Sequence, residues 1–207
     1  MKKILVHGSG HKATSWIKTI EYIKDKKEIL CPDLSKILKD KEASYENLYS
    51  SFVEYCNAVD GKIDLCGLSL GGILSLNYAL DFPNKVNSLI LIGTPHKVPK
   101  ITFSIQNIIF KFLPKSLFES MAFNKKNTFI LGNSMKNLDF SNRVKTIHCP
   151  VLIICGEKDS ANIKSANYLY KNIKYSDLII LKNTGHVINE ENPKKLASLI
   201  NNFWKKF

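Results

Sequence analysis

The chain lacks any long apolar run. None of its hydrophobic stretches approaches the roughly 20 residues that a helix needs to cross a bilayer, so we expect no integral membrane association. The apolar segment at residues 4–6 ends at His7 and Gly8, far short of the ~7–15-residue core of a signal peptide. We therefore expect a cytoplasmic protein.

Cysteine patterns typical of metal and redox sites are also missing. The five cysteines, at positions 31, 56, 66, 149 and 155, form no C-x-x-C pair and no Cys/His spacing of the zinc type. Three of them stand in apolar, strand-like segments, where a free thiol behaves as a small hydrophobic side chain. We expect reduced, structural cysteines and a protein that needs neither a metal nor a cofactor.

Arginine is almost absent, although the net charge is +12. Arg143 is the only arginine, and the lysines are spread over nearly every predicted helix and turn. Base and phosphate recognition favours the bidentate arginine fork, so we expect no nucleic-acid partner. We interpret the lysines as a solvated surface that attracts anionic substrates weakly at most.

The sequence has no internal repeat and no low-complexity segment, and its 207 residues suit one domain. A hydrophobic content of 44% with 23% charged residues is typical of a folded soluble protein. Short apolar strands alternate with helical segments, and the strands start near residues 3, 28, 62, 86, 151 and 177. This alternation predicts an α/β fold with a mostly parallel sheet of about six strands, covered by helices on both faces.

Helical periodicity covers residues 15–23, 44–59, 70–82, 165–173 and 193–204, with Ser44 as a predicted N-cap and Pro193 in a first turn. Residues 97–149 break the alternation and predict a small helical cap insertion within the single domain 1–207. Its helical pieces are expected near 101–113, 116–123 and 128–138. Its apolar residues would either line an acyl pocket or pack against the main domain.

The segment 63–80 carries the most informative motif, G-x-S-x-G between an apolar strand and an apolar helix. A strand that turns into a helix within one residue brings the positions two before and two after the pivot together. Gly67 and Gly71 therefore flank Ser69, because side chains there would collide. We expect Ser69 in a strained conformation with an exposed hydroxyl, and Gly72 to let the helix approach neighbouring backbone.

Polar residues follow the other predicted strands. These are residues 7–10, 94–96, Asp159 and His186. The carboxyl ends of parallel strands meet at one edge, where open α/β sheets bind ligands. A serine hydroxyl needs a base to remove its proton, and the base works best when a carboxylate fixes its tautomer. Ser69, Asp159 and His186 supply these three groups.

These motifs resemble those of the α/β-hydrolase family. The matching stretches are HGSG after the first strand, GLSLGG at Ser69, PVLIICGEKD before Asp159 and NTGHVINEENP around His186. The resemblance spans nearly the whole chain, although the antiparallel hairpin with which many members begin is missing and the insertion is short. It implies the α/β-hydrolase fold and a catalytic triad of Ser69, Asp159 and His186.

The resemblance also implies an oxyanion hole. The expected donors are the backbone N–H groups of Leu70 and Ser9, with Gly10 as the alternative to Ser9. We expect Gly8, Gly10 and His96 to contact substrate. No phosphate-binding glycine motif is present.

Other residues compete for the acid and base roles. His96 is the alternative base, whereas His7 is expected to be structural and His11 and His148 to be solvated. Asp33, Glu157 and Asp177 are the alternative acids; we expect Asp33 near the far edge of the sheet and Glu157 on the surface.

The leading hypothesis is a serine hydrolase that cleaves carboxylic esters of small or medium acyl substrates through an acyl-enzyme intermediate. An acyl thioesterase or a C–C bond hydrolase of the same fold is the alternative within this chemistry. From another class, a hydrolase-like protein that binds a ligand without turnover remains open. A haloalkane dehalogenase is disfavoured, because that reaction uses an aspartate in place of Ser69.

Overall fold

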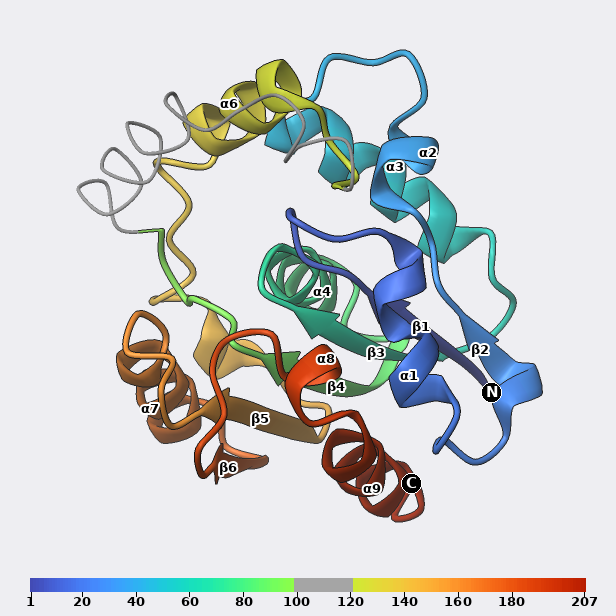
Figure 1. Cartoon of the computed structure of the whole chain (residues 1–207), viewed down its shortest axis with the longest axis vertical. Helices are drawn as coiled ribbons and strands as arrows, with labels where there is room; N and C mark the ends of the chain where they lie inside the picture. The colour runs from blue at the N-terminus through green and yellow to red at the C-terminus, as the bar shows by residue number, and fades with distance from the viewer. Residues whose placement is uncertain (99–120) are drawn as a thin grey trace.

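The computed structural model describes residues 1–98 and 121–207 (Figure 1). Within these residues, six strands form one sheet in the order β2-β1-β3-β4-β5-β6, and every neighbouring pair is parallel. The strands are β1 (Lys2–Val6), β2 (Ile29–Leu30), β3 (Ile63–Leu68), β4 (Val86–Ile92), β5 (Val151–Gly156) and β6 (Ser176–Leu181). The predicted α/β fold and its six strands are confirmed.

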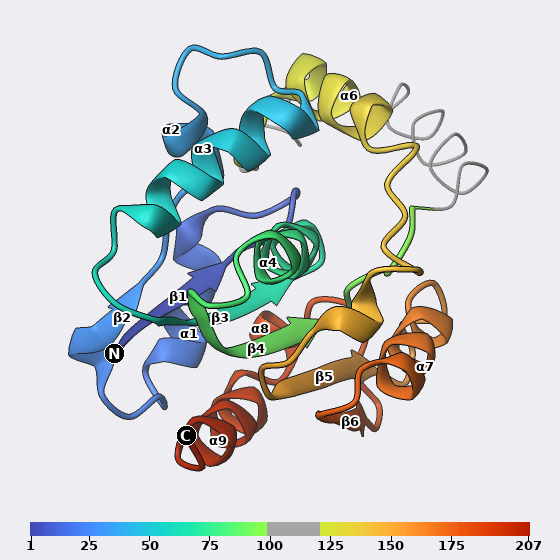
Figure 2. The ribbon, with the colours of Figure 1, turned by 180° about the vertical axis from the view of Figure 1, so that it is seen from behind.

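Helices cover both faces of the sheet (Figures 1 and 2). One face carries α2 (Leu34–Leu38), α3 (Tyr45–Asn57), α4 (Leu70–Asp81), α6 (Lys125–Ser134) and α7 (Ile163–Asn172). The other carries η1 (Ala13–Trp16), α1 (Ile17–Ile20), α8 (Ile188–Glu191) and α9 (Pro193–Trp204). Two short 3₁₀ turns, η2 (Lys26–Glu28) and η4 (Val144–Thr146), complete the described elements.

The carboxyl-terminal halves of the central strands are apolar because both faces of the sheet are buried there. In β4, Leu89 and Leu91 pack into the core under α3 and α4, whereas Ile90 and Ile92 pack into the core under α9. All four side chains are fully buried, and each such burial stabilises the fold by about 1.5–3 kcal/mol. The central strands therefore hold the sheet together, while β6 lies at an edge and leaves Ile180 38% exposed.

Helix boundaries follow their capping residues. The Ser44 side chain accepts a hydrogen bond of 3.2 Å from the Asn47 N–H, which confirms the predicted N-cap of α3. Asp33 caps α2 by accepting from the Ser35 N–H at 3.1 Å. The sequence did not predict α2 or α8, because elements of five and four residues are too short to display helical periodicity.

The predicted cap insertion is described only in part. Its expected piece at 101–113 and most of the one at 116–123 lie outside the described residues, and the third is α6. Ser134 at the end of α6 accepts a 2.8 Å hydrogen bond from the N–H of Tyr45 in α3. Phe123, Leu131 and Met135 are buried in the main core. This part of the insertion therefore packs against the main domain.

Among residues 1–98 and 121–207, no helix combines the length and the hydropathy required to traverse a bilayer.

Candidate active site

Ser69 lies at the junction of β3 and α4 with φ 54° and ψ −113°. A positive φ is unfavourable for a residue with a side chain and is retained where the surrounding structure demands it. A Cβ atom at Gly67 would lie 2.3 Å from the carbonyl carbon of Gly71, which is the close approach that the motif predicts. The tight turn at residues 67–71, here called the elbow, is therefore present.

The elbow is also pressed against neighbouring strands. A Cβ at Gly71 would lie 2.2 Å from the carbonyl oxygen of Val6, so the start of α4 contacts the end of β1. A Cβ at Gly72 would lie 1.9 Å from the side-chain Oγ1 of Thr94. The prediction that Gly72 accommodates backbone was thus wrong: it accommodates a side chain from the segment after β4.

Asp159 and His186 form a direct pair. Nδ1 of His186 lies 2.7 Å from Oδ2 of Asp159. The aspartate side chain is 4% exposed and the histidine 37%, so the carboxylate is buried and the ring is open to solvent. A carboxylate in this position fixes the tautomer with a proton on Nδ1 and leaves Nε2 as an acceptor.

Backbone contacts bring the two residues together. The acid turn (residues 156–159) follows β5, and the histidine loop (residues 182–187) follows β6. A Cβ at Gly156 would lie 2.0 Å from the carbonyl oxygen of Gly185, and the N–H of Lys158 donates to the carbonyl of Thr184 at 2.9 Å. Glu157, an alternative acid, accepts from the N–H of Asn183 at 2.9 Å and so joins these two segments instead.

Gly93, directly after β4, connects this pair with the elbow. Its φ is +50°, and a Cβ there would lie 2.9 Å from Nδ1 of His186 and 3.1 Å from Oδ2 of Asp159. The preceding residue, Ile92, accepts the N–H of Ser69 at 2.9 Å. The structure therefore brings Ser69, Asp159 and His186 to neighbouring strand ends at one edge of the sheet. The sequence signal for Gly93 was a glycine directly after a buried strand.

The histidine loop contains one non-glycine residue with a positive φ. Its left-handed residue is Asn183, at φ 56°. Gly185 instead lies against Glu191, whose carboxylate accepts the N–H of Gly185 at 2.6 Å and that of Val187 at 3.2 Å. Glu191 thus binds the backbone on both sides of His186, a function that sequence reasoning missed.

The loop after β1 lies beside the elbow. A Cβ at Gly8 would lie 3.5 Å from Cβ of Ser69 and 3.3 Å from Nδ1 of His11. Ser9 and Gly10 are exposed next to it. Leu70 is the first residue of α4, where the backbone N–H has no acceptor within the helix. The loop that carries Ser9 therefore lies next to Ser69, and the role of the Leu70 and Ser9 N–H groups as oxyanion donors remains a prediction.

Two other histidines of this region are held by neighbouring elements. His7 is fully buried; Nε2 accepts from the N–H of Leu34 at 3.0 Å, and Nδ1 donates to the carbonyl of Gly8 at 2.8 Å. This agrees with the structural role expected for it. His11 is partly buried, with Nε2 4.0 Å from a Glu190 oxygen, so the expectation that it is solvated was wrong. Burial lowers the pKa of both histidines.

His96, the alternative base, is oriented toward α7. Its Nδ1 lies 3.0 Å from Oγ of Ser165, and its ring stacks on Tyr168 with centroids 4.0 Å apart. The nearest hydrogen-bonding partner is thus a hydroxyl, not a carboxylate, and burial lowers the pKa of His96. Contact of His96 with substrate remains a prediction.

The remaining competitors lie elsewhere. Asp33 caps α2 near the edge strand β2, as expected of its position. Asp177 is exposed and lies 3.7 Å from Nζ of Lys206. His148 is exposed, which agrees with the expectation. Asp159 and His186 are therefore the acid and base candidates that the fold brings together.

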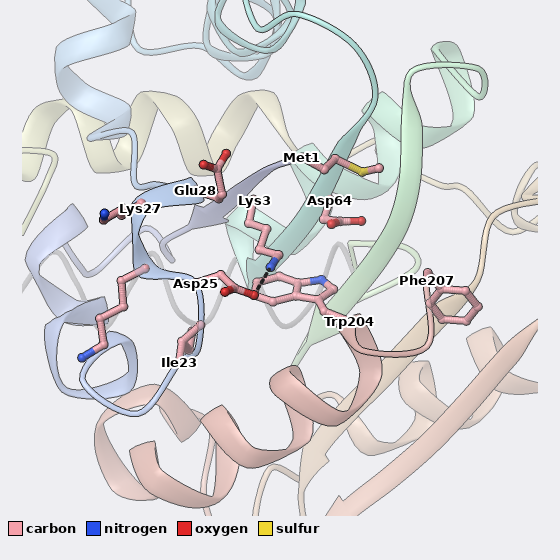
Figure 3. Close-up of a pocket in the computed structure, with 10 residues that line it drawn as sticks. Met1, Lys3, Ile23, Asp25, Lys27, Glu28, Asp64, Trp204 and Phe207 are labelled. Carbon is pink, nitrogen blue, oxygen red and sulfur yellow. Dashed lines mark ion pairs between the residues drawn. The ribbon is translucent and has the colours of Figure 1, made fainter.

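A cavity of about 840 Å³ lies at the opposite, amino-terminal edge of the sheet (Figure 3). Lys3, Asp25, Asp64 and Trp204 line it, and Nζ of Lys3 is 3.7 Å from Oδ2 of Asp25 and 5.2 Å from the Trp204 ring centre. It contains none of the elbow or histidine-loop residues. Among the described residues, no three His, Cys, Asp or Glu side chains are grouped as metal ligands.

The buried state of His7 predicts acid sensitivity. Its pKa is lowered from 6.5 in the folded protein, so below about pH 6.5 the unfolded chain binds a proton that the folded chain does not. The free energy of unfolding should therefore fall with decreasing pH, by at most about 1.4 kcal/mol per pH unit for this group. Urea unfolding at pH 7.5 and 5.5 measures this; His7→Gln should reduce the difference. The exposed His148→Gln is the control, and an equal reduction there would contradict the assignment.

The contacts of Glu191 predict that it orders the histidine loop. Glu191→Ala should lower the free energy of unfolding by about 1 kcal/mol and accelerate amide hydrogen exchange at Gly185 and Val187. The neighbouring Glu190→Ala, which leaves both backbone bonds in place, is the matched control. Unchanged exchange at the two amides would show that the carboxylate does not hold the loop.

Comparison with known proteins agrees with this geometry. The family model described as "alpha/beta hydrolase fold" matches residues 4–129. The monoacylglycerol lipase ABHD6 of Mus musculus is 21% identical over 97% of this chain and 74% of its own length. A pimeloyl-[acyl-carrier protein] methyl ester esterase of Legionella pneumophila (strain Lens) is 24% identical over 90% of this chain and 88% of its own length.

Solved structures share the fold. A thermophilic esterase from Thermogutta terrifontis superposes with a TM-score of 0.80 at 20% identity, covering 100% of this chain and 90% of its own. MenH from S. aureus gives 0.81 at 18% identity, covering 99% and 94%. The matched family model and the elbow between β3 and α4 lead to one conclusion: this chain belongs to the α/β-hydrolase family.

Proposed function

We propose that this hydrolase cleaves carboxylic esters of small or medium acyl substrates through a covalent acyl-enzyme, with Ser69 as nucleophile, His186 as general base and acid, and Asp159 as the residue that orients His186. The observation that carries the proposal is the 2.7 Å contact between His186 Nδ1 and the buried carboxylate of Asp159. The Asp159–His186 pair lies against Gly93. The residue before Gly93, Ile92, accepts the hydrogen bond from the N–H of Ser69.

Acylation begins when Nε2 of His186 accepts the proton of the Ser69 hydroxyl and the Ser69 oxygen attacks the ester carbonyl. The carbonyl π electrons move to oxygen, which the N–H groups of Leu70 and Ser9 stabilise, with Leu70 aided by the positive end of the α4 dipole. The intermediate collapses, the C–O bond to the alcohol breaks, and the imidazolium of His186 returns its proton to the leaving alkoxide.

Deacylation repeats these steps with water. His186 accepts a proton from the attacking water, the second tetrahedral intermediate forms on the same donors, and the bond to Oγ of Ser69 breaks as Oγ regains the proton. Asp159 stays ionised throughout and stabilises the transient imidazolium. The net reaction consumes one water and releases a carboxylic acid and an alcohol.

The choice of esters has two supports. The neutral hydrogen-bonding groups around the elbow suit an oxyanion that develops only in the transition state. Relatives named above act on a monoacylglycerol and on a methyl ester according to their names. An acyl thioester follows the same steps, and the chain's net charge of +12 favours anionic carriers of such groups.

The proposal predicts that Ser69→Ala lowers kcat on short p-nitrophenyl esters by ~10⁴-fold or more, because the nucleophile is lost. A fluorophosphonate probe should label the wild-type protein at Ser69 and leave Ser69→Ala unlabelled. Ser160→Ala, an exposed serine beside Asp159, is the matched control and should keep both activities.

Labelling at another residue, or ester hydrolysis that survives Ser69→Ala, would refute the assignment. A panel of esters and acyl-CoA thioesters with varied acyl length distinguishes the two substrate classes. Turnover of acyl-CoA that exceeds ester turnover and falls with salt would identify a thioesterase. Tight ligand binding with no turnover would identify a non-catalytic binding protein.

A further inference from the structure

The Asp159 carboxylate has a second partner besides His186. Nδ2 of Asn162 lies 2.9 Å from Oδ1 and 3.0 Å from Oδ2 of Asp159. Only His186 and Asn162, among the described residues, donate hydrogen bonds to this carboxylate. The amide nitrogen must face the carboxylate, because the amide oxygen would be repelled there. Without Asn162, Oδ1 of a carboxylate that is 4% exposed would have no donor from these residues.

Asn162 makes these bonds instead of capping its own helix. It occupies the N-cap position of α7, yet its side chain accepts no hydrogen bond from the first turn. At the same position of α6, Asn124 accepts from the N–H of Asn127 at 2.9 Å in the usual way. The two asparagines differ in backbone conformation, which is extended at Asn124 (φ −65°, ψ 171°) and αR at Asn162 (φ −109°, ψ −12°), and the Asn162 side chain binds the acid instead of its own helix. Helix formation alone does not account for the orientation of Asn162.

The bonds from Asn162 change what Asp159 offers to His186. Hydrogen bonds donated to a carboxylate stabilise its charged form and disperse its negative charge. Nδ2 of Asn162 also lies 3.3 Å from Nδ1 of His186, so both nitrogens converge on the same carboxylate. The amide therefore restricts the rotation of the carboxylate and competes with the imidazole for its electron density.

We propose that Asn162 is a positioning residue for the triad: it holds Asp159 toward Nδ1 of His186 and limits how strongly that carboxylate stabilises the imidazolium. The inference rests on the proposed function, in which His186 must accept a proton from Ser69 and then return it. A carboxylate that binds the imidazolium too strongly keeps the histidine protonated, and one that turns away no longer fixes its tautomer.

Other titratable groups surround the pair and stay in place when Asn162 is changed. His11 approaches His186 from the loop after β1, and Glu190 of α8 lies 4.0 Å from Nε2 of His11. Glu191 binds the backbone of the histidine loop. Near the end of β5, burial raises the pKa of the Cys155 thiol, and the neighbouring Asp159 carboxylate raises it further.

The first test compares pH profiles of wild type, Asn162→Ala and Asn167→Ala. Asn162→Ala should lower kcat about tenfold with little change in KM, since a hydrogen bond to a charged group is lost away from the substrate. The acid limb of kcat/KM should move to higher pH, because the Asp159 carboxylate stabilises the imidazolium of His186 more strongly when it no longer accepts hydrogen bonds from Asn162. Asn167 lies on the same helix and donates to the carbonyl of Ile163 at 2.8 Å, so Asn167→Ala is the matched control and should match wild type.

Asn162→Asp tests the charge directly. It replaces the donor with a second carboxylate of nearly the same shape, so the acid limb should move further than in Asn162→Ala. A limb that stays in place or moves to lower pH in both variants would overturn the proposal, as would a change confined to KM.

A second measurement is independent of turnover. NMR titration of His186 in the Ser69→Ala protein should give a higher pKa when Asn162→Ala is added and an unchanged pKa with Asn167→Ala. This holds whether or not the wild-type protein cleaves esters, so failure of the proposed function and failure of this inference are distinguishable. Equal His186 pKa values with and without the Asn162 side chain, in folded proteins, would overturn the inference.

Discussion

Contact between backbones at the carboxyl edge of the sheet is the constraint on which the site depends. Glycines at positions 67, 71 and 156 each lie where a Cβ atom would be within 2.3 Å of another residue's main chain. These contacts compress the elbow against β1 and the acid turn against the histidine loop. Since no side chain separates the segments, residues from five parts of the chain share one small region.

The close contact between the acid turn and the histidine loop also explains the burial of the Asp159 carboxylate. Asp159 is buried where the acid turn meets the histidine loop, and a buried carboxylate is stable only when donors replace its water. His186 and Asn162 supply those donors, so the orientation of the carboxylate is fixed and it is hydrogen-bonded to the imidazole. Nδ1 of His186 faces Asp159, which leaves Nε2 for the proton exchange with Ser69 that the proposed function requires.

The sequence predicted the fold and the glycine contacts of the elbow well, for identifiable reasons. Buried parallel strands can be predicted because they appear in the sequence as short apolar runs. The G-x-S-x-G motif between a strand and a helix can be predicted because the spacing of its glycines follows from a steric requirement. The structure bears out that cause at Gly67 and Gly71.

What the sequence could not predict depends on side-chain direction. Nothing in the spacing distinguishes Asn162, which donates to Asp159, from Asn124, which caps α6. Likewise, the spacing does not indicate that Asn183 adopts the left-handed conformation in this loop or that Gly185 accommodates Glu191. His11 was expected in solvent because its neighbours in the sequence are polar. Such choices follow from tertiary packing, which local propensity does not contain.

The position of β6 has a consequence for how this enzyme would lose activity. Ser69, the proposed nucleophile, follows the central strand β3, whereas the histidine loop follows the edge strand β6, which pairs with β5 alone. Edge elements open in local fluctuations well below the free energy of global unfolding. Mild heat or denaturant would therefore release the histidine loop first, so the proposed activity would be lost before the remaining fold unfolds.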